Sequence, residues 1–194
     1  MLINHDLEYI YIDTPKTGGT SVESVLMRKY NFETVVRSLG WGGDRHNRII
    51  KEECKHYTKI ATVRNPYTRT LSQWTFNKLL RDRLDKFNHI QEFVDWLVYL
   101  NKNTSVDECI HDICGWFSCS KYLKLPGYDI IIKQEELEQG INNLEFIEEP
   151  IKLPNINDSN SKKYNHLLTP NVIAKINEYC EQDFIEFNYK KEKI

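Results

Sequence analysis

Short apolar runs alternate along the chain with longer segments in which apolar residues recur every third or fourth position. The runs YIYI at 9–12 and HYTKIATV at 56–63 predict buried strands, because branched and aromatic residues are frequent in them. The segments SVESVLMRKY at 21–30 and FNHIQEFVDWLVYLNK at 87–102 predict helices with one apolar face. This alternation favours an α/β fold with a mostly parallel central sheet flanked by helices.

Weaker patterns predict the remaining elements. ETVVRS at 33–38 has the composition of a second strand, and HNRIIKEEC at 46–54 has that of a short helix. The polar stretch at 151–168 predicts a flexible loop, and the charged end at 190–194 predicts a frayed tail. Between them, the Thr-Pro pair at 169–170 supplies an N-cap and a first helical residue, so a final helix is expected to begin there.

A glycine-containing loop joins the first strong strand to the first strong helix. The strand pattern breaks at Pro15, and the sequence PKTGGTS leads directly into the helix. A helix N-terminus attracts anions through its backbone N–H groups and its dipole, glycines allow close approach, and Lys16 adds a full positive charge. The predicted anion-binding residues are Lys16, Thr17, Gly18, Gly19, Thr20 and Ser21.

This loop differs from the Walker A loop of many nucleotide-binding proteins. In Walker A the lysine follows the glycines and is itself followed by the hydroxyl that holds magnesium, whereas Lys16 precedes the glycines. We therefore expect a nucleotide site that requires no metal. The structural alternative is that Gly18 and Gly19 only turn the chain into the helix.

A second anion-binding pattern begins where the predicted strand at 56–63 ends. The sequence RNPYTRTLSQW places Arg64 at the end of that strand, Pro66 in the first turn of a helix and Ser72 roughly two turns into it. An anion held there would receive a bidentate guanidinium and a hydroxyl. Because ligands of open α/β sheets bind at such strand ends, the two patterns together predict a ligand with two separated phosphate groups.

Composition and charge narrow the class of protein. A chain of 194 residues with 28% charged and 40% hydrophobic residues fits one soluble domain over 1–194, and the net charge of -2 argues against nucleic-acid binding. No apolar run could span a membrane and the N-terminus is no signal peptide, so a cytoplasmic protein is expected. The five cysteines form no CxxC pair, which favours buried free thiols, with a disulfide as the alternative.

The two anion-binding patterns resemble those of sulfotransferases that use 3′-phosphoadenosine 5′-phosphosulfate (PAPS). PKTGGTS is similar to the family's 5′-phosphosulfate loop and RNPYTRTLSQW to its 3′-phosphate element, particularly in the carbohydrate (2-O/4-O-type) branch. The segments at 128–147 and 163–189 also resemble the family, whereas about 84–125 matches weakly. The resemblance implies a single-domain sulfotransferase with a P-loop-like nucleotide-binding fold.

The resemblance assigns a role to each matching residue. Residues 16–21 would hold the 5′-phosphosulfate, and Arg64 and Ser72 would hold the 3′-phosphate. Arg69 also fits the family pattern, although a structural salt bridge on the helix is an equal alternative. Trp74 stands where the family often has an aromatic residue, and we interpret it as part of the core.

Two residues are expected to carry out the chemistry. Sulfuryl transfer resembles phosphoryl transfer, so catalysis requires positioning, stabilisation of the leaving oxygen and removal of the acceptor proton. Lys16 is the candidate for stabilising the leaving oxygen. His46 lies between the two patterns, resembles the catalytic histidine of the 2-O/4-O-type relatives and titrates near neutrality, so it is the candidate base. A carboxylate such as Glu23 is the second choice.

The acceptor side is predicted only in outline. The resemblance implies a hydroxyl-bearing acceptor, expected to be a glycan, and the aromatic segment at 111–128 either lines its site or packs in the core. Lys162 and Lys163 either close over the donor or belong to a solvated linker. Two other functions stay open, a magnesium-dependent kinase or phosphatase and a non-catalytic nucleotide-binding module. Nothing in the sequence predicts an oligomeric state.

Overall fold

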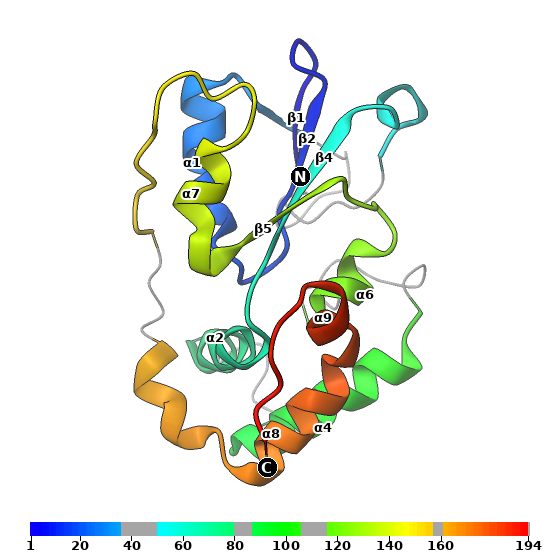
Figure 1. Cartoon of the computed structure of the whole chain (residues 1–194). Coiled ribbons are helices and arrows are strands. Elements are labelled where there is room, and N and C mark those ends of the chain that lie inside the picture. The colour runs from blue at the N-terminus through cyan, green and yellow to red at the C-terminus, as the bar shows by residue number, and fades with distance from the viewer. Residues whose placement is uncertain (36–49, 80–86, 106–115, 157–160, 194) are drawn as a thin grey trace. The chain divides into compact units, whose positions relative to one another are not determined.

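The computed structural model of the chain describes residues 1–35, 50–79, 87–105, 116–156 and 161–193. It shows the α/β architecture that the sequence predicts, a five-stranded sheet with helices beside it (Figure 1). Within these ranges no helix is both long enough and apolar enough to cross a membrane.

Two compact units make up the chain. The first comprises Met1–Val63 and Leu123–Asn157, and the second comprises Arg64–Tyr122 and Asp158–Ile194. All the strands of the described chain belong to the first unit, whereas the second is helical. The boundary after Val63 has a consequence for the site, because it assigns the two predicted anion-binding patterns to different units.

The sheet of the first unit has the strand order β3-β1-β2-β4-β5. Its strands are β1 (Leu2–Asn4), β2 (Tyr9–Ile12), β3 (Glu33–Thr34), β4 (Thr58–Val63) and β5 (Ile130–Lys133). β4 runs parallel to β2 and to β5, with Ile12 opposite Ala61, whereas β1 pairs antiparallel with both β2 and β3. The predicted parallel arrangement thus holds for the β2-β4-β5 part, and the β1–β3 edge makes the sheet mixed.

Helices α1 (Gly19–Lys29) and α7 (Leu137–Asn142) bury their apolar residues against this sheet. Val22, Val25 and Leu26 of α1 lie in one core cluster with residues of β2, β4, β5 and α7. α7 follows β5 through the 3₁₀ helix η3 (Gln134–Glu136). Of the helix predicted at 46–54, the described part contains only the 3₁₀ helix η2 (Glu52–Cys54).

The second unit is built from helices. They are α2 (Pro66–Leu79), α4 (Ile90–Asn103), most of α6 (Cys119–Leu123), η4 (Ser161–Leu167), α8 (Pro170–Tyr179) and α9 (Glu181–Glu186). Trp74 is buried and its ring lies 5.6 Å from that of Phe93 on α4, which confirms that it belongs to the core. Burial of Trp116, Phe117 and Tyr122 favours core packing for the aromatic segment at 111–128, of which 111–115 lie outside the described residues.

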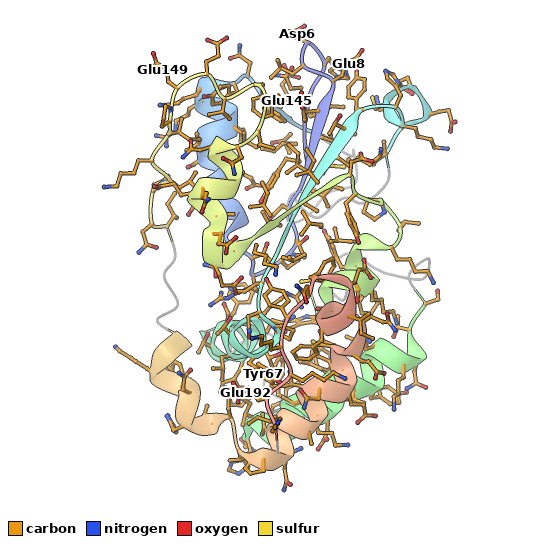
Figure 2. The ribbon with its side chains drawn as sticks, viewed as in Figure 1. Asp6, Glu8, Tyr67, Glu145, Glu149 and Glu192 are labelled. Atoms are coloured by element: carbon orange, nitrogen blue, oxygen red, sulfur yellow. The ribbon has the colours of Figure 1, made fainter. Side chains whose placement is uncertain are left out.

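The C-terminal part of the second unit is more ordered than its sequence predicts. Residues 161–167, within the predicted loop, form the 3₁₀ helix η4, and the Thr169 hydroxyl caps α8 as expected. Where the sequence predicts a frayed tail, the Glu192 N–H donates to the Tyr67 hydroxyl at 2.7 Å (Figure 2). Lys191 pairs with Glu181 at 3.6 Å, so the tail up to Glu192 is held against α2 and α9.

Candidate active site

The predicted phosphate loop connects β2 to α1 in the first unit, as the sequence indicates. Two of its residues adopt left-handed backbone conformations, Lys16 with φ 70° and Gly18 with φ 90°. Such a conformation is common for glycine but strained for lysine, and strained residues of this kind concentrate at functional sites. The half-buried Lys16 is therefore held in an unusual conformation within the loop.

Both glycines of the loop are required by close contacts. A Cβ atom added to Gly18 would lie 2.8 Å from Cδ2 of Leu137, and one added to Gly19 would lie 1.7 Å from Oδ1 of Asp13. Gly19 therefore lets the Asp13 carboxyl group approach the first turn of α1. The glycines thus turn the chain into the helix and also allow a close approach, which here is that of the Asp13 carboxyl group to Gly19.

The N-termini of α1 and α2 differ in how they are capped. Gly18 occupies the N-cap of α1, and no side chain caps that helix. In α2 the Asn65 side chain accepts hydrogen bonds from the N–H groups of Tyr67 at 3.0 Å and Thr68 at 3.4 Å. The Ser21 N–H donates to the Gly18 carbonyl at 3.1 Å, so what α1 would offer to an anion is its dipole and the N–H groups that precede Ser21.

The three hydroxyl residues of the loop have different surroundings. Thr17 is fully buried, and its hydroxyl donates to the Thr14 carbonyl at 2.6 Å and lies 2.6 Å from the Thr62 hydroxyl. The Ser21 hydroxyl accepts from the Ile156 N–H at 3.4 Å, while Thr20 is half-buried. The Thr17 hydroxyl is thus not available to a ligand, whereas the Ser21 hydroxyl still has its proton to donate.

The second predicted element lies at the start of the second unit. Arg64 follows β4 directly, is half-buried, and donates from Nε to the Thr68 hydroxyl at 3.1 Å. This bond orients the guanidinium. Ser72 lies on α2 as the sequence predicts and is buried, and its hydroxyl makes no hydrogen bond in the described part of the chain. The Ser72 hydroxyl could therefore still donate to a phosphate group, and the planar guanidinium of Arg64 has the geometry to pair with one.

The Arg69 side chain is buried in the interior of the second unit. It is 1% exposed, and Nη1 donates to the Phe117 carbonyl at 2.8 Å. In the same interior, the Asp183 carboxylate accepts from the N–H groups of Cys119 at 2.8 Å and Ser120 at 2.7 Å. Burial raises the pKa of Asp183 while these hydrogen bonds lower it. The structural interpretation of Arg69 is therefore favoured, as an anchor between α2 and the turn before α6.

The candidate base falls outside the described residues, because His46 lies within 36–49. Glu23, the second choice, is described and is buried on α1, one turn after Gly19. Cys54, Cys119 and Cys180 are buried free thiols, as expected. Among the residues that the structure describes, no group of three or more His, Cys, Asp or Glu side chains is placed to hold a metal ion.

Sequence reasoning missed the partners that organise these elements. Asn65, which caps α2, and Asp13, which packs on Gly19, have ordinary sequence surroundings. An Asn immediately before a Pro at a helix start is a capping signal that could have been recognised. The contact of Thr17 with Thr62 joins residues 45 apart in sequence, and no local pattern could have predicted it.

Comparison with known proteins decides the family. A model of the sulfotransferase family matches residues 1–190, which is nearly the whole chain. The chain belongs to the sulfotransferase family. Searches of curated proteins and of solved structures each found no match to this sulfotransferase.

Family membership fixes the general activity. The protein is a PAPS-dependent sulfotransferase that transfers a sulfuryl group to a hydroxyl acceptor. The α/β fold with its parallel β2-β4-β5 core is consistent with this family. A PAPS donor has a 5′-phosphosulfate and a 3′-phosphate, the two charged groups for which the sequence predicts binding elements.

Proposed function

We propose that this sulfotransferase acts on a hydroxyl group of a carbohydrate and belongs to the 2-O/4-O-type branch of its family. The carbohydrate branch rests on the resemblance of PKTGGTS and RNPYTRTLSQW to that branch. The observation that carries the donor site is the loop between β2 and α1, where the left-handed Lys16 and Gly18 precede a helix without a side-chain cap. Such a loop offers backbone N–H groups and a lysine to an anion without a metal. Residues 16–21 hold the 5′-phosphosulfate of PAPS in this proposal.

The same proposal assigns the 3′-phosphate of PAPS to Arg64 and Ser72. The parallel pairing of β2 with β4 supports it, because the loop after Ile12 and the chain after Val63 leave the sheet at the same edge. Because Asn65 caps α2, binding of the 3′-phosphate in this proposal depends on the Arg64 guanidinium rather than on helix N–H groups.

The chemistry of the proposed reaction needs few groups. The acceptor oxygen forms a bond to sulfur while the bond from sulfur to the 5′-phosphate oxygen breaks, and adenosine 3′,5′-bisphosphate leaves. Lys16 stabilises the negative charge that develops on the leaving oxygen. The acceptor proton passes to His46, with Glu23 as the alternative base.

Transfer of labelled sulfate from PAPS to a panel of acceptors tests this proposal. The panel contains oligosaccharides, a tyrosine peptide and simple alcohols, and magnesium is removed with a chelator. We expect transfer to an oligosaccharide without magnesium, loss of transfer in Lys16→Ala and His46→Ala, and normal transfer in the control Lys29→Ala, whose side chain is exposed on α1. Transfer only to the peptide would overturn the carbohydrate assignment. An active His46→Ala variant would move the base elsewhere.

A further inference from the structure

A row of buried hydroxyl groups runs from the sheet into the phosphate loop. The Tyr11 hydroxyl on β2 lies 3.1 Å from the Thr62 hydroxyl on β4, which lies 2.6 Å from the hydroxyl of Thr17. Thr17 in turn donates to the Thr14 carbonyl at 2.6 Å. Tyr11, Thr62 and Thr17 are each 0% exposed, so water does not compete for these hydrogen bonds.

The direction of every hydrogen bond in this row follows from proton counting. A hydroxyl group has one proton to donate, and the proton of Thr17 goes to the Thr14 carbonyl. The bond between Thr17 and Thr62 must therefore use the Thr62 proton, and the bond between Thr62 and Tyr11 must use the Tyr11 proton. The row runs Tyr11 to Thr62 to Thr17 to Thr14, and each link polarises the next.

This direction determines how Thr17 takes part in donor binding. Because its hydroxyl proton is used within the loop, Thr17 does not donate that proton to a bound phosphosulfate. The hydrogen bond from Thr17 to Thr14 closes the turn that contains Pro15 and Lys16. That turn holds Lys16 at φ 70°, a conformation that is strained for a non-glycine residue.

We propose that Thr62 is a positioning residue for the sulfuryl-transfer site and acts on Lys16 through Thr17. Thr62 stands at the centre of the row, where it accepts from Tyr11 and donates to Thr17, so it joins β2, β4 and the loop. Without the Thr62 hydroxyl, the Thr17 hydroxyl no longer accepts a hydrogen bond, and the Lys16 turn loses its link to β4. The inference rests on the proposed role of Lys16 at the leaving oxygen.

Replacement of each hydroxyl has a different expected effect. Thr62→Val breaks both of its links and leaves the Tyr11 hydroxyl without its acceptor on β4, whereas Thr62→Ser keeps the hydroxyl. Tyr11→Phe removes the outer link of the row and leaves the hydrogen bond from Thr62 to Thr17 in place. The damage to turnover is therefore ordered Thr62→Val, then Tyr11→Phe, then Thr62→Ser. Thr58→Val, the same substitution at the other end of β4, is the matched control.

Steady-state kinetics and calorimetry with adenosine 3′,5′-bisphosphate test the inference. We expect kcat of Thr62→Val to fall about 10- to 100-fold, as for a misplaced catalytic group, with a smaller change in bisphosphate affinity. Thr62→Ser should restore kcat, and thermal unfolding should show that all variants are folded at the assay temperature.

The outcomes of these measurements distinguish a failure of the Thr62 inference from a failure of the proposed function. A Thr62→Val variant with the kcat of the wild type overturns the inference and leaves the proposed function intact. An equal loss of kcat in Thr58→Val or in Thr62→Ser also overturns it, because the effect would then not come from the hydroxyl. If Thr62→Val is unfolded, kcat of Tyr11→Phe is compared with kcat of Thr62→Ser. The inference predicts the lower kcat for Tyr11→Phe, and equal values overturn it. A wild type that neither binds bisphosphate nor transfers sulfate overturns the proposed function itself.

Discussion

At the scale of single residues, Lys16 combines a positive charge with a backbone conformation that lysine rarely adopts. Lys16 has a φ of 70° and lies in the turn from Thr14 to Thr17, which a buried hydrogen bond closes. A fixed ammonium group contributes most where charge develops during the reaction, because it does not have to reorganise. The conformation of Lys16 thus fits a role in the transition state rather than in ground-state binding.

The Lys16→Ala substitution tests this role. We expect kcat to fall by about 100-fold or more, while the affinity for adenosine 3′,5′-bisphosphate changes much less. Single-turnover kinetics and calorimetry measure the two quantities, with Lys29→Ala as the control for loss of one positive charge on α1. A loss of affinity with unchanged kcat would contradict the role.

Thr14 offers a second test at the residue scale. Its hydroxyl is buried and has no hydrogen-bond partner in the described part of the chain. A buried hydroxyl without a partner costs about 1–3 kcal/mol, so Thr14→Val is expected to stabilise the protein by about 1 kcal/mol, or about 2–4 °C in Tm. Thr17→Val, which loses two hydrogen bonds, is expected to lower Tm. A lower Tm for Thr14→Val would show that its hydroxyl is used.

At the scale of elements, local patterns predicted the strands and helices that position the site. The strands β2 and β4 and the helices α1, α2 and α4 lie where apolar periodicity and the Pro66 signal place them. β1 was missed because LIN is only three residues long and its pairing with β2 is set by the sheet. The division of the final helix at Cys180 into α8 and α9 was also missed, because no proline or glycine marks that position.

The elements that carry the candidate site residues were predicted, but the contacts of these residues were not, and their roles in donor binding stay predictions. Residue types and spacing located the Lys16 loop and the Arg64 element. They could not show that the Thr17 hydroxyl points to β4 or that Arg69 is buried against Phe117, since both contacts join distant parts of the sequence. His46 stays a prediction, because it lies outside the described residues.

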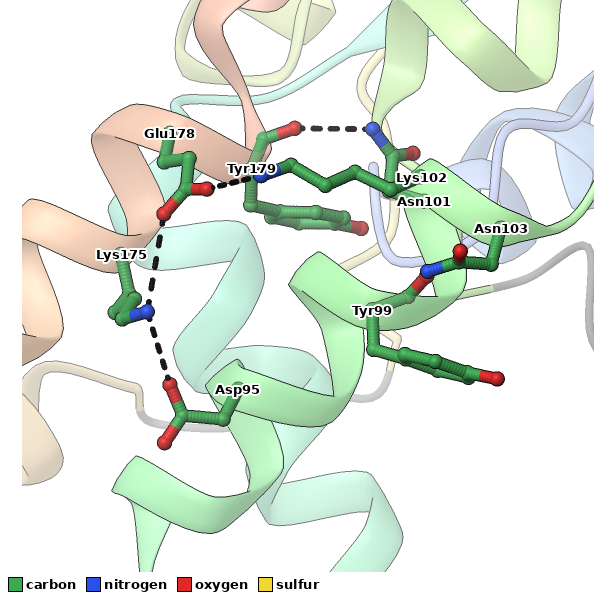
Figure 3. A network of polar contacts seen from close by, with 8 residues as sticks. All are labelled: Asp95, Tyr99, Asn101, Lys102, Asn103, Lys175, Glu178 and Tyr179. Carbon is green, nitrogen blue, oxygen red and sulfur yellow. Dashed lines mark hydrogen bonds and ion pairs between the residues drawn. The ribbon is translucent and has the colours of Figure 1, made fainter.

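Helices α4 and α8 of the second unit are joined by a network of charged side chains (Figure 3). Lys102 of α4 pairs with Glu178 of α8, and Lys175 bridges Asp95 at 3.5 Å and Glu178 at 3.8 Å. The hydrogen bond from Lys102 lowers the pKa of Glu178 below its ordinary value. The stabilisation that Glu178 gives to the folded protein is fully present above the pKa that this residue has in the unfolded state. It is lost as the pH falls through the lower pKa of Glu178 in the folded state.

The Glu178→Gln substitution tests this pH dependence. The side chains are 40% exposed or more, so the loss at neutral pH is expected to stay below about 1 kcal/mol. Urea unfolding at about pH 7 and about pH 3 should show a difference from wild type that shrinks at the lower pH. Glu148→Gln, an exposed residue with no ion pair in the described chain, is the control. A difference that grows at low pH would contradict the assigned cause.

At the scale of the whole molecule, each unit carries one of the two predicted anion-binding elements. The Lys16 loop belongs to the first unit, and Arg64 and Ser72 belong to the second. Under the proposed function, the 5′-phosphosulfate of PAPS binds at the loop and its 3′-phosphate binds at Arg64. An enzyme altered in either element would then lose contact with a different group of the donor.

Calorimetric titration of adenosine 3′,5′-bisphosphate and adenosine 5′-monophosphate into wild type and Arg64→Ala is the most direct measurement of this claim. We predict that wild type prefers the bisphosphate, and that Arg64→Ala binds it about 2–4 kcal/mol more weakly while its affinity for the monophosphate is unchanged. The exposed Arg28→Ala on α1 should behave as wild type. An Arg64→Ala variant that keeps the full preference for the 3′-phosphate would contradict the account.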